Sequence, residues 1–175
     1  MNPLLSKINI MILLVLAVLL LSCGDGITPE QESEAGFSGK ISFMGAWPDS
    51  VIRTHIVVFK DPLLAASDFN ILNLKYVSLE IPYGISEFSF NSLDSAFLPD
   101  PGKLPAGEYS YLAVAMSKST ALSLNRIDWF VAGVFYADGD TTNPGKLVIP
   151  ENTLVKDINI ICDFNNPPPQ PPGGQ

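Results

Sequence analysis

Apolar and polar residues alternate with a period of two over much of the chain after residue 35. Residues 37–43 (FSGKISF) show this most clearly, because Phe37, Ile41 and Phe43 fall at alternate positions with serine or lysine beside them. Residues 155–164 repeat the pattern further along the chain. A period of two places successive side chains on opposite faces of a strand, so both segments are predicted to be half-buried β-strands.

Three further segments are apolar at consecutive positions rather than at alternate ones. They are residues 53–60, 108–117 and 127–136, and each is rich in β-branched or aromatic side chains. Such side chains favour strands, and a strand that is apolar on both faces is covered on both faces. We therefore predict that these segments are inner strands of a sheet.

Shorter strands and irregular connections account for the remaining central residues. Alternation predicts strands at 76–81 and 85–91 and a short one at 146–149, while prolines and a glycine mark 92–104 as a loop. Residues 63–72 are compatible with one short helix or with an irregular excursion. The connection 118–126 is polar in character and is expected to be flexible.

The number and spacing of these strands indicate an all-β domain over residues 36–164. Seven or eight strands are expected, and no amphipathic segment is long enough for the helix of a βαβ unit. An antiparallel β-sandwich is therefore the expected fold, with a closed barrel as the alternative.

The chain begins with a short apolar run that ends at a cysteine. Residues 8–21 are almost entirely aliphatic and follow Lys7, but 14 residues fall short of the roughly 20 that span a bilayer as a permanent helix. The run ends in Leu20-Leu21-Ser22-Cys23, which resembles the lipobox of bacterial lipoproteins. The alternative is an ordinary secretory signal in which the cysteine falls there by chance.

The lipobox resemblance implies a lipid anchor. Residues 1–22 would be removed as a signal peptide, and Cys23 would become a lipidated N-terminus, since two or three acyl chains anchor stably where one does not. Residues 23–35 would then form an acidic, flexible tether. The implied location is the bacterial cell envelope, at the outer membrane, with display on the periplasmic or the surface face left open.

Composition narrows the classes of partner. The chain carries 10 basic and 18 acidic residues, and residues 1–22 contain one of the former and none of the latter. This excess of acidic residues argues against binding to nucleic acid and against adsorption to an anionic membrane surface. Residues 165–175 are rich in proline and are expected to be a disordered tail.

The number of cysteines predicts that the domain has no internal disulfide. If Cys23 carries lipid, Cys162 is the one remaining cysteine. It shares a strand face with Ile158, Ile160 and Phe164, so it is predicted to be a buried core thiol.

Three patches together resemble transthyretin-like sandwiches, the carboxypeptidase regulatory-like domains. They are residues 37–43 as an opening strand, residues 104–114 with the turn and strand LPAGEY, and residues 131–136 followed by Pro144 and residues 158–160. The resemblance implies a transthyretin-like or immunoglobulin-like sandwich that serves as a non-catalytic accessory or binding module. It transfers no reaction and no cofactor.

No residue pattern specifies a catalytic centre. His55 is the one histidine, it lies in a predicted strand, and no Gly-x-Ser-x-Gly elbow or Ser-x-x-Lys pair accompanies it. A wall or edge position in the fold is the expected role of His55. We therefore predict that the protein is not an enzyme and holds no cofactor.

Two binding sites remain as hypotheses from the sequence. Asp138, Asp140 and Asn143 could supply some oxygen ligands to calcium, although Asp-Gly is also ordinary turn chemistry and the spacing departs from an EF-hand. Trp47 lies in a predicted loop and could stack on a sugar ring. The expected function is a membrane-anchored envelope lipoprotein with a binding or accessory domain for an envelope protein, and the alternative is a carbohydrate-binding module. Strand edges and the loop 92–103 are the expected contact surfaces.

Overall fold

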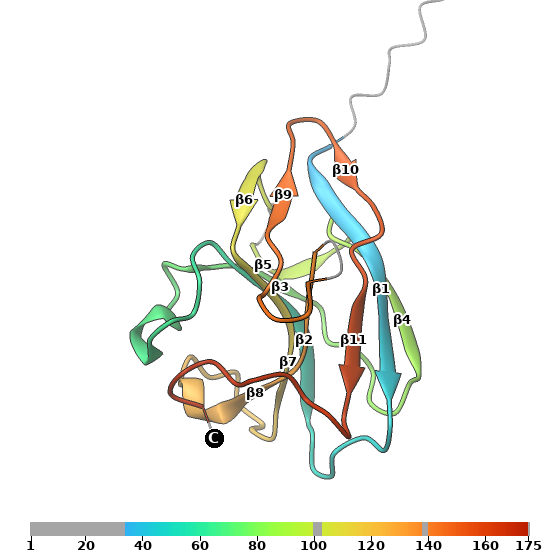
Figure 1. Cartoon of the computed structure of the whole chain (residues 1–175), viewed down its shortest axis with the longest axis vertical. Helices are drawn as coiled ribbons and strands as arrows, with labels where there is room; N and C mark the ends of the chain where they lie inside the picture. Colours follow the sequence, from blue (N-terminus) through green and yellow to red (C-terminus); the bar gives the residue numbers. More distant parts are fainter. Residues whose placement is uncertain (1–33, 100–102, 138–139, 175) are drawn as a thin grey trace, which may run out of the picture. The chain divides into compact units, whose positions relative to one another are not determined.

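The computed structural model describes residues 34–99, 103–137 and 140–174 (Figure 1). All of these residues belong to the compact unit Ser33–Gln175. The signal segment, Cys23 and most of the expected tether lie outside the described residues.

The first sheet is built around the long strand β1 (Gly36–Met44). The strand β4 (Glu87–Asn91) pairs with it in antiparallel fashion on one side. On the other side β10 (Leu154–Val155) pairs with the beginning of β1 and β11 (Ile160–Asp163) with its end, both in parallel. Figure 1 shows β11 and β4 on either side of β1.

The second sheet has five strands in the order β5-β3-β2-β7-β8, and every pair in it is antiparallel. The strand β2 (Arg53–Phe59) lies at its centre and pairs along its whole length with β7 (Tyr111–Ser117). The strand β3 (Leu74–Ser78) lies on the other side of β2, and the edge strands are β5 (Ala96–Leu98) and β8 (Trp129–Val134).

A small third sheet and two short helices complete the described part of the chain. The strands β6 (Gly107–Tyr109) and β9 (Leu147–Ile149) pair in antiparallel fashion. The 3-10 helices are η1 (Ala66–Asp68) and η2 (Arg126–Asp128). No helix within the described ranges has the length and apolar character needed to cross a membrane.

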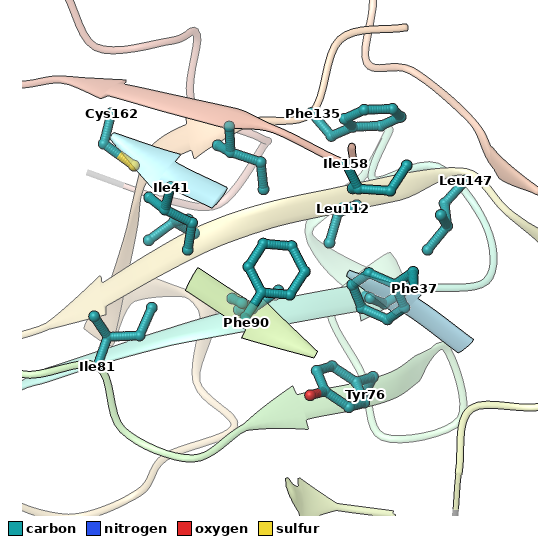
Figure 2. Packing of buried hydrophobic residues seen from close by; sticks show 14 of the residues in the cluster. Phe37, Ile41, Tyr76, Ile81, Phe90, Leu112, Phe135, Leu147, Ile158 and Cys162 are labelled. Atoms are coloured by element: carbon teal, nitrogen blue, oxygen red, sulfur yellow. The ribbon is translucent and has the colours of Figure 1, made fainter. Parts of the chain in front are cut away.

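The sandwich core lies between the two large sheets (Figure 2). Phe37 from β1 meets Tyr76 and Phe90 edge to face, with ring centroids 5.4 and 5.7 Å apart. The second sheet contributes the side chains of alternate residues on β2 and β7, which include Ile56 and Leu112. Full burial of one such side chain stabilises a fold by about 1.5–3 kcal/mol, so this cluster is the main source of stability.

Two glycines let segments of backbone approach closely. A Cβ at Gly39 on β1 would lie 2.0 Å from the carbonyl oxygen of Ile158, and a Cβ at Gly133 on β8 would lie 2.6 Å from the sulfur of Cys162. The first approach lets the backbone between β10 and β11 lie directly against β1. The second brings β8, at the edge of one sheet, against β11 of the other.

The predicted all-β sandwich is confirmed, with differences in detail. The expected strand 155–164 is divided into β10 and β11, because the chain turns at Asp157, whose φ is +61°. The expected strand 108–117 is divided at Ser110, whose N–H donates to the carbonyl oxygen of Lys60 at 3.1 Å. The parallel pairing of β10 and β11 with β1 departs from the expected purely antiparallel arrangement, since both strands run along one edge of β1 in its own direction.

The C-terminal segment also differs from the expected disordered tail. The side-chain amide of Gln170 donates to the carbonyl oxygen of Val131 at 2.8 Å and accepts from its N–H at 2.7 Å. A primary amide offers the same donor and acceptor as a peptide group, so Gln170 occupies the edge of β8 as a strand would. Pro171 is buried beside it and accepts a hydrogen bond from Arg126.

Candidate functional site: an apolar pocket outside the sandwich core

The outer face of the five-stranded sheet carries a pocket with a volume of about 290 Å³. Its lining is apolar apart from one serine and consists of Val57, Phe59, Phe69, Ile71, Leu74, Val77, Phe97, Leu98, Ala115, Leu122, Ser123, Leu124 and Trp129. A pocket with so little polar lining favours a ligand that is itself apolar.

The floor of the pocket is the sheet face that points away from the sandwich core. Alternation along β2 sends Ile56 into the core and Val57 to the opposite face, where a second apolar cluster forms. The strand β7 contributes the small residues Ala113 and Ala115 to this cluster. Because these side chains are short while Trp129 of the neighbouring strand is large, the sheet face is hollow at this point.

One wall is the excursion between β2 and β3, and local hydrogen bonds hold its shape. The Asp68 carboxylate accepts from the N–H groups of Leu64 and Ala65 at 2.9 and 2.7 Å. The Asn73 amide donates to the carbonyl oxygen of Asp68 at 2.9 Å. Phe69 packs from this wall against Phe59 of the floor, with ring centroids 5.5 Å apart. Residues 63–72 combine the two predictions, since they form an irregular excursion that contains the three-residue 3-10 helix η1.

The opposite wall is the connection between β7 and β8, which contributes Leu122, Ser123 and Leu124. The indole N–H of Trp129 donates to the carbonyl oxygen of Ser123 at 2.8 Å, which fixes the wall to the sheet. The connection was expected to be polar and flexible, and its two leucines make it an apolar wall instead.

Arg126 ties this wall to the excursion and to the C-terminal segment. Its side chain is buried, donates to the carbonyl oxygens of Trp129 and Pro171, and lies over the ring of Phe69 at 5.8 Å. Desolvation lowers the pKa of the guanidinium. The role of Arg126 is to join three segments around the pocket.

Four lining residues are also exposed at the mouth of the pocket. Ile71, Phe97, Leu122 and Leu124 are between 42% and 54% exposed, and we call them the collar. They come from the excursion, from β5 and from the connection after β7. Clustered exposed apolar side chains mark a surface that meets an apolar partner.

His55 lies on the same sheet face but is not exposed. Its ring is buried 6.0 Å from the ring of Trp129, and Nδ1 lies 2.9 Å from the carbonyl oxygen of Ser78, which can only accept, so Nδ1 carries the proton. Within the described residues Nε2 has no hydrogen-bond partner. Burial lowers the pKa of His55, and this outweighs the opposing effects of the Ser78 carbonyl and of Glu80. His55 is a neutral wall residue, in agreement with the sequence prediction.

Asp140 and Asn143, two of the three candidate calcium ligands, bond to each other within one turn. Asp138 lies outside the described residues. The Asp140 carboxylate accepts from the N–H of Thr142 at 2.8 Å and from the Asn143 amide at 3.3 Å, and these bonds lower its pKa. This is an Asx turn. In the described ranges no three histidine, cysteine or acidic side chains gather as a metal site.

Trp47 lies in the loop after β1, as predicted, but its ring is half-buried. It packs against Phe43 and Phe164 with ring centroids 4.6 and 5.3 Å apart, and its N–H donates to the carbonyl oxygen of Ile85 at 3.0 Å. The neighbouring Tyr83, 5.0 Å away, is the more exposed ring.

Cys162 is fully buried in the sandwich core, as predicted, and burial raises the pKa of its thiol to about 12. Figure 2 shows it at one end of the cluster. A thiol of this kind behaves as a small apolar side chain.

The comparisons with known proteins give no match, either to a family model, to a curated protein or to a solved structure. The geometry of the pocket is therefore the basis for a functional proposal.

Sequence reasoning missed most of the pocket. The expected contact loop 92–103 does contribute Phe97 and Leu98, but the two long walls were not expected. A usable signal was present in the sequence. The three segments predicted to be inner strands are apolar on both faces, so another part of the chain had to cover the outer face of their sheet.

Proposed function

We propose that this chain is a lipid-anchored protein of the bacterial envelope whose β-sandwich is a non-catalytic binding domain for an apolar ligand. The observation that carries the proposal is the 290 Å³ pocket with its nearly all-carbon lining. It is roughly twice the 150 Å³ of an engineered apolar cavity that binds benzene, so it has room for a ligand of useful size.

The chemistry of the lining supports binding rather than a reaction. Ser123 supplies the one hydroxyl among the lining residues, and the rest offer hydrocarbon or aromatic surface. The nearby ionisable groups, Arg126 and His55, are buried and donate to backbone carbonyls. What the site can supply is removal of apolar surface from water, worth about 25 cal/mol per Å².

The anchor part of the proposal rests on Leu20-Leu21-Ser22-Cys23. A lipid on Cys23 would hold the domain at a membrane by a short acidic tether. The mass of the mature N-terminal peptide tests this part. A peptide that begins at Cys23 and carries acyl groups supports it, and an unmodified Cys23 or cleavage elsewhere overturns it.

Membership of the transthyretin-like sandwiches belongs to the same proposal. The patches that carry the resemblance occupy structural positions. Gly39 and Gly133 allow close approaches of backbone, and the hydroxyl of Tyr109 donates to the carbonyl oxygen of Pro105 at 2.6 Å across the turn that leads into β6. Such positions suit a scaffold whose binding sites are carried by its connections.

Filling the pocket is expected to abolish ligand binding. Ala115 lies on the floor, and a phenylalanine there would occupy the space that a ligand needs. Titration with 1-aminoanthracene, a neutral dye whose fluorescence increases out of water, measures this in the chain produced from Gly24 onward, which lacks both the apolar run 8–21 and the lipid and so needs no detergent. We expect saturable binding, weakened at least about tenfold by Ala115→Phe, since several buried methylene equivalents are lost at about 0.8 kcal/mol each.

Val148→Phe is the matched control for this titration, because Val148 lies half-exposed on β9 outside the pocket lining. Its affinity for the dye should equal that of the parent. Equal affinity in all three proteins would show that the dye binds elsewhere and would overturn the proposal.

The second candidate function is carbohydrate binding, which the pairing of Trp47 with the exposed ring of Tyr83 favours. Adjacent aromatic rings at a surface can stack on sugars. Tryptophan fluorescence during titration with polysaccharides tests it. A saturable change that disappears in Trp47→Ala, together with no binding of the dye, would place the function at this site instead of the pocket.

A further inference from the structure

We infer that the ligand of the pocket is the hydrocarbon chain of a membrane lipid, inserted between the excursion and the connection after β7. This inference rests on the proposed function and names its ligand class. Three observations carry it: the size of the pocket, the collar at its mouth, and the position at which the tether enters the domain.

The size and the lining suit a hydrocarbon chain. A cavity of 150 Å³ accepts the six carbons of benzene, so about 290 Å³ corresponds to roughly a dozen carbons. A lipid chain of a dozen carbons needs no hydrogen-bond partner, and the Ser123 hydroxyl is the one hydroxyl group that the lining offers. A polar ligand of the same size would lose its hydrogen bonds to water with little replacement, which costs about 1–3 kcal/mol for each group.

The collar distinguishes a lipid in a membrane from a small molecule in solution. A small molecule from solution needs only the buried lining residues to remove its apolar surface from water. The collar residues Ile71, Phe97, Leu122 and Leu124 extend the apolar surface outward around the mouth. Side chains of this kind sit favourably at the boundary between headgroups and acyl chains. The collar would therefore meet the leaflet while the pocket receives one of its chains.

The tether enters the domain beside Lys103, a few residues after the strand β5 that contributes Phe97 and Leu98 to the pocket. Glu34, the first described residue, forms an ion pair with Lys103, which follows the pocket residue Leu98 by five positions, at most about 18 Å of chain. From Cys23 to Glu34 the chain can extend over about 37 Å. A lipid on Cys23 would keep the collar within reach of the membrane that holds the anchor.

The driving force comes from the protein's own apolar surface. A lipid chain that leaves the bilayer interior for the pocket exchanges one hydrocarbon environment for another. In the same step the lining and the collar lose their contact with water, which is favourable in proportion to the apolar area removed. The acidic charge of the chain opposes adsorption by electrostatics alone, so an apolar contact is the one that fits this surface.

Photo-crosslinking in cells tests this inference on the full chain. Bacteria that produce the protein are grown with a fatty acid carrying a diazirine near the end of its chain, so that their phospholipids incorporate it. After illumination, mass spectrometry locates the adducts. We expect adducts that carry a whole glycerophospholipid, on peptides containing residues 97–98 and 122–124.

Two variants and one control sharpen the result. Ala115→Phe fills the floor, and Leu124→Asp places a carboxylate in the collar at a half-exposed position that the fold tolerates. Each variant should reduce these adducts at least about tenfold. Ala115→Phe removes the space for the lipid chain, and Leu124→Asp removes apolar surface that the lipid chain would contact. Val148→Phe should leave them unchanged. The melting temperature of each protein confirms that it is folded.

Three outcomes would overturn the inference. The first is adducts scattered over the surface and insensitive to both variants. The second is adducts with the mass of a free fatty acid, and the third is adducts joined to the acyl group of Cys23 itself. If 1-aminoanthracene binds to the pocket while any of these is found, the binding function stands and the assignment of a membrane lipid as ligand falls.

Discussion

Substitution of Gly39 by alanine is expected to reduce the free energy of unfolding by about 3 kcal/mol or more, which removes a large part of the stability of a typical domain. The added Cβ would lie 2.0 Å from the carbonyl oxygen of Ile158. The clashing atom is backbone, so no side-chain rotation relieves it, and the segment between β10 and β11 must move off β1. Urea unfolding followed by circular dichroism measures the change.

Gly84→Asn is the control for this substitution. Gly84 has a φ of +84° and no atom within 4 Å of the position of a Cβ. Asparagine tolerates a positive φ better than other residues with a side chain, so we expect a loss below about 1 kcal/mol. Equal stability of Gly39→Ala and the parent would show that the backbone at Ile158 does not lie against Gly39.

Replacement of Arg126 by methionine is expected to cost about 3 kcal/mol, because two buried carbonyl oxygens, those of Trp129 and Pro171, lose their donor. Methionine keeps much of the apolar length of the side chain, so the loss is chiefly that of the hydrogen bonds. The C-terminal segment should also become accessible to protease, and the wall with Leu122 and Leu124 should loosen. Urea unfolding and limited proteolysis followed by mass spectrometry report these two effects.

Lys146→Met removes a cation from an exposed pair with Glu108 at 3.9 Å and serves as the matched control. Exposed ion pairs of this kind contribute about 0–1 kcal/mol, so its stability should stay close to that of the parent. If Arg126→Met behaved like Lys146→Met and left the C-terminal segment protected, Arg126 would not be the residue that joins the three segments around the pocket.

Much of the fold could be predicted from the sequence because periodicity reports burial directly. The alternation over residues 37–43 identified β1, and the doubly apolar segments identified β2, β7 and β8. The prediction that all three are inner strands was wrong for β8, which lies at the edge of its sheet and is covered there by the C-terminal segment. The burial of Cys162 followed from its place on the apolar face of its strand. Pairing direction could not be predicted, since alternation is the same in parallel and antiparallel strands. The division of residues 155–164 depends on a single turn at Asp157.

The walls and the hollow of the pocket could not be predicted from the sequence, for a different reason. Its walls are irregular segments, in which Leu122 and Leu124 follow no period that indicates burial. Its hollow depends on Ala115 standing beside larger residues of neighbouring strands, and this requires the register. The C-terminal segment is held in place by the side-chain amide of Gln170, which pairs with the edge of β8. The proline-rich composition around Gln170 suggested a disordered tail instead.

Quenching of Trp129 fluorescence by a brominated twelve-carbon fatty acid tests the central claim, that the pocket holds an apolar chain, most directly. The chain has two tryptophans, so Trp47→Phe leaves Trp129 in the pocket lining as the sole reporter. Bromine quenches only at close range. We expect saturable quenching that disappears in Ala115→Phe. Quenching no greater than that of free indole, or undiminished in Ala115→Phe, would contradict it.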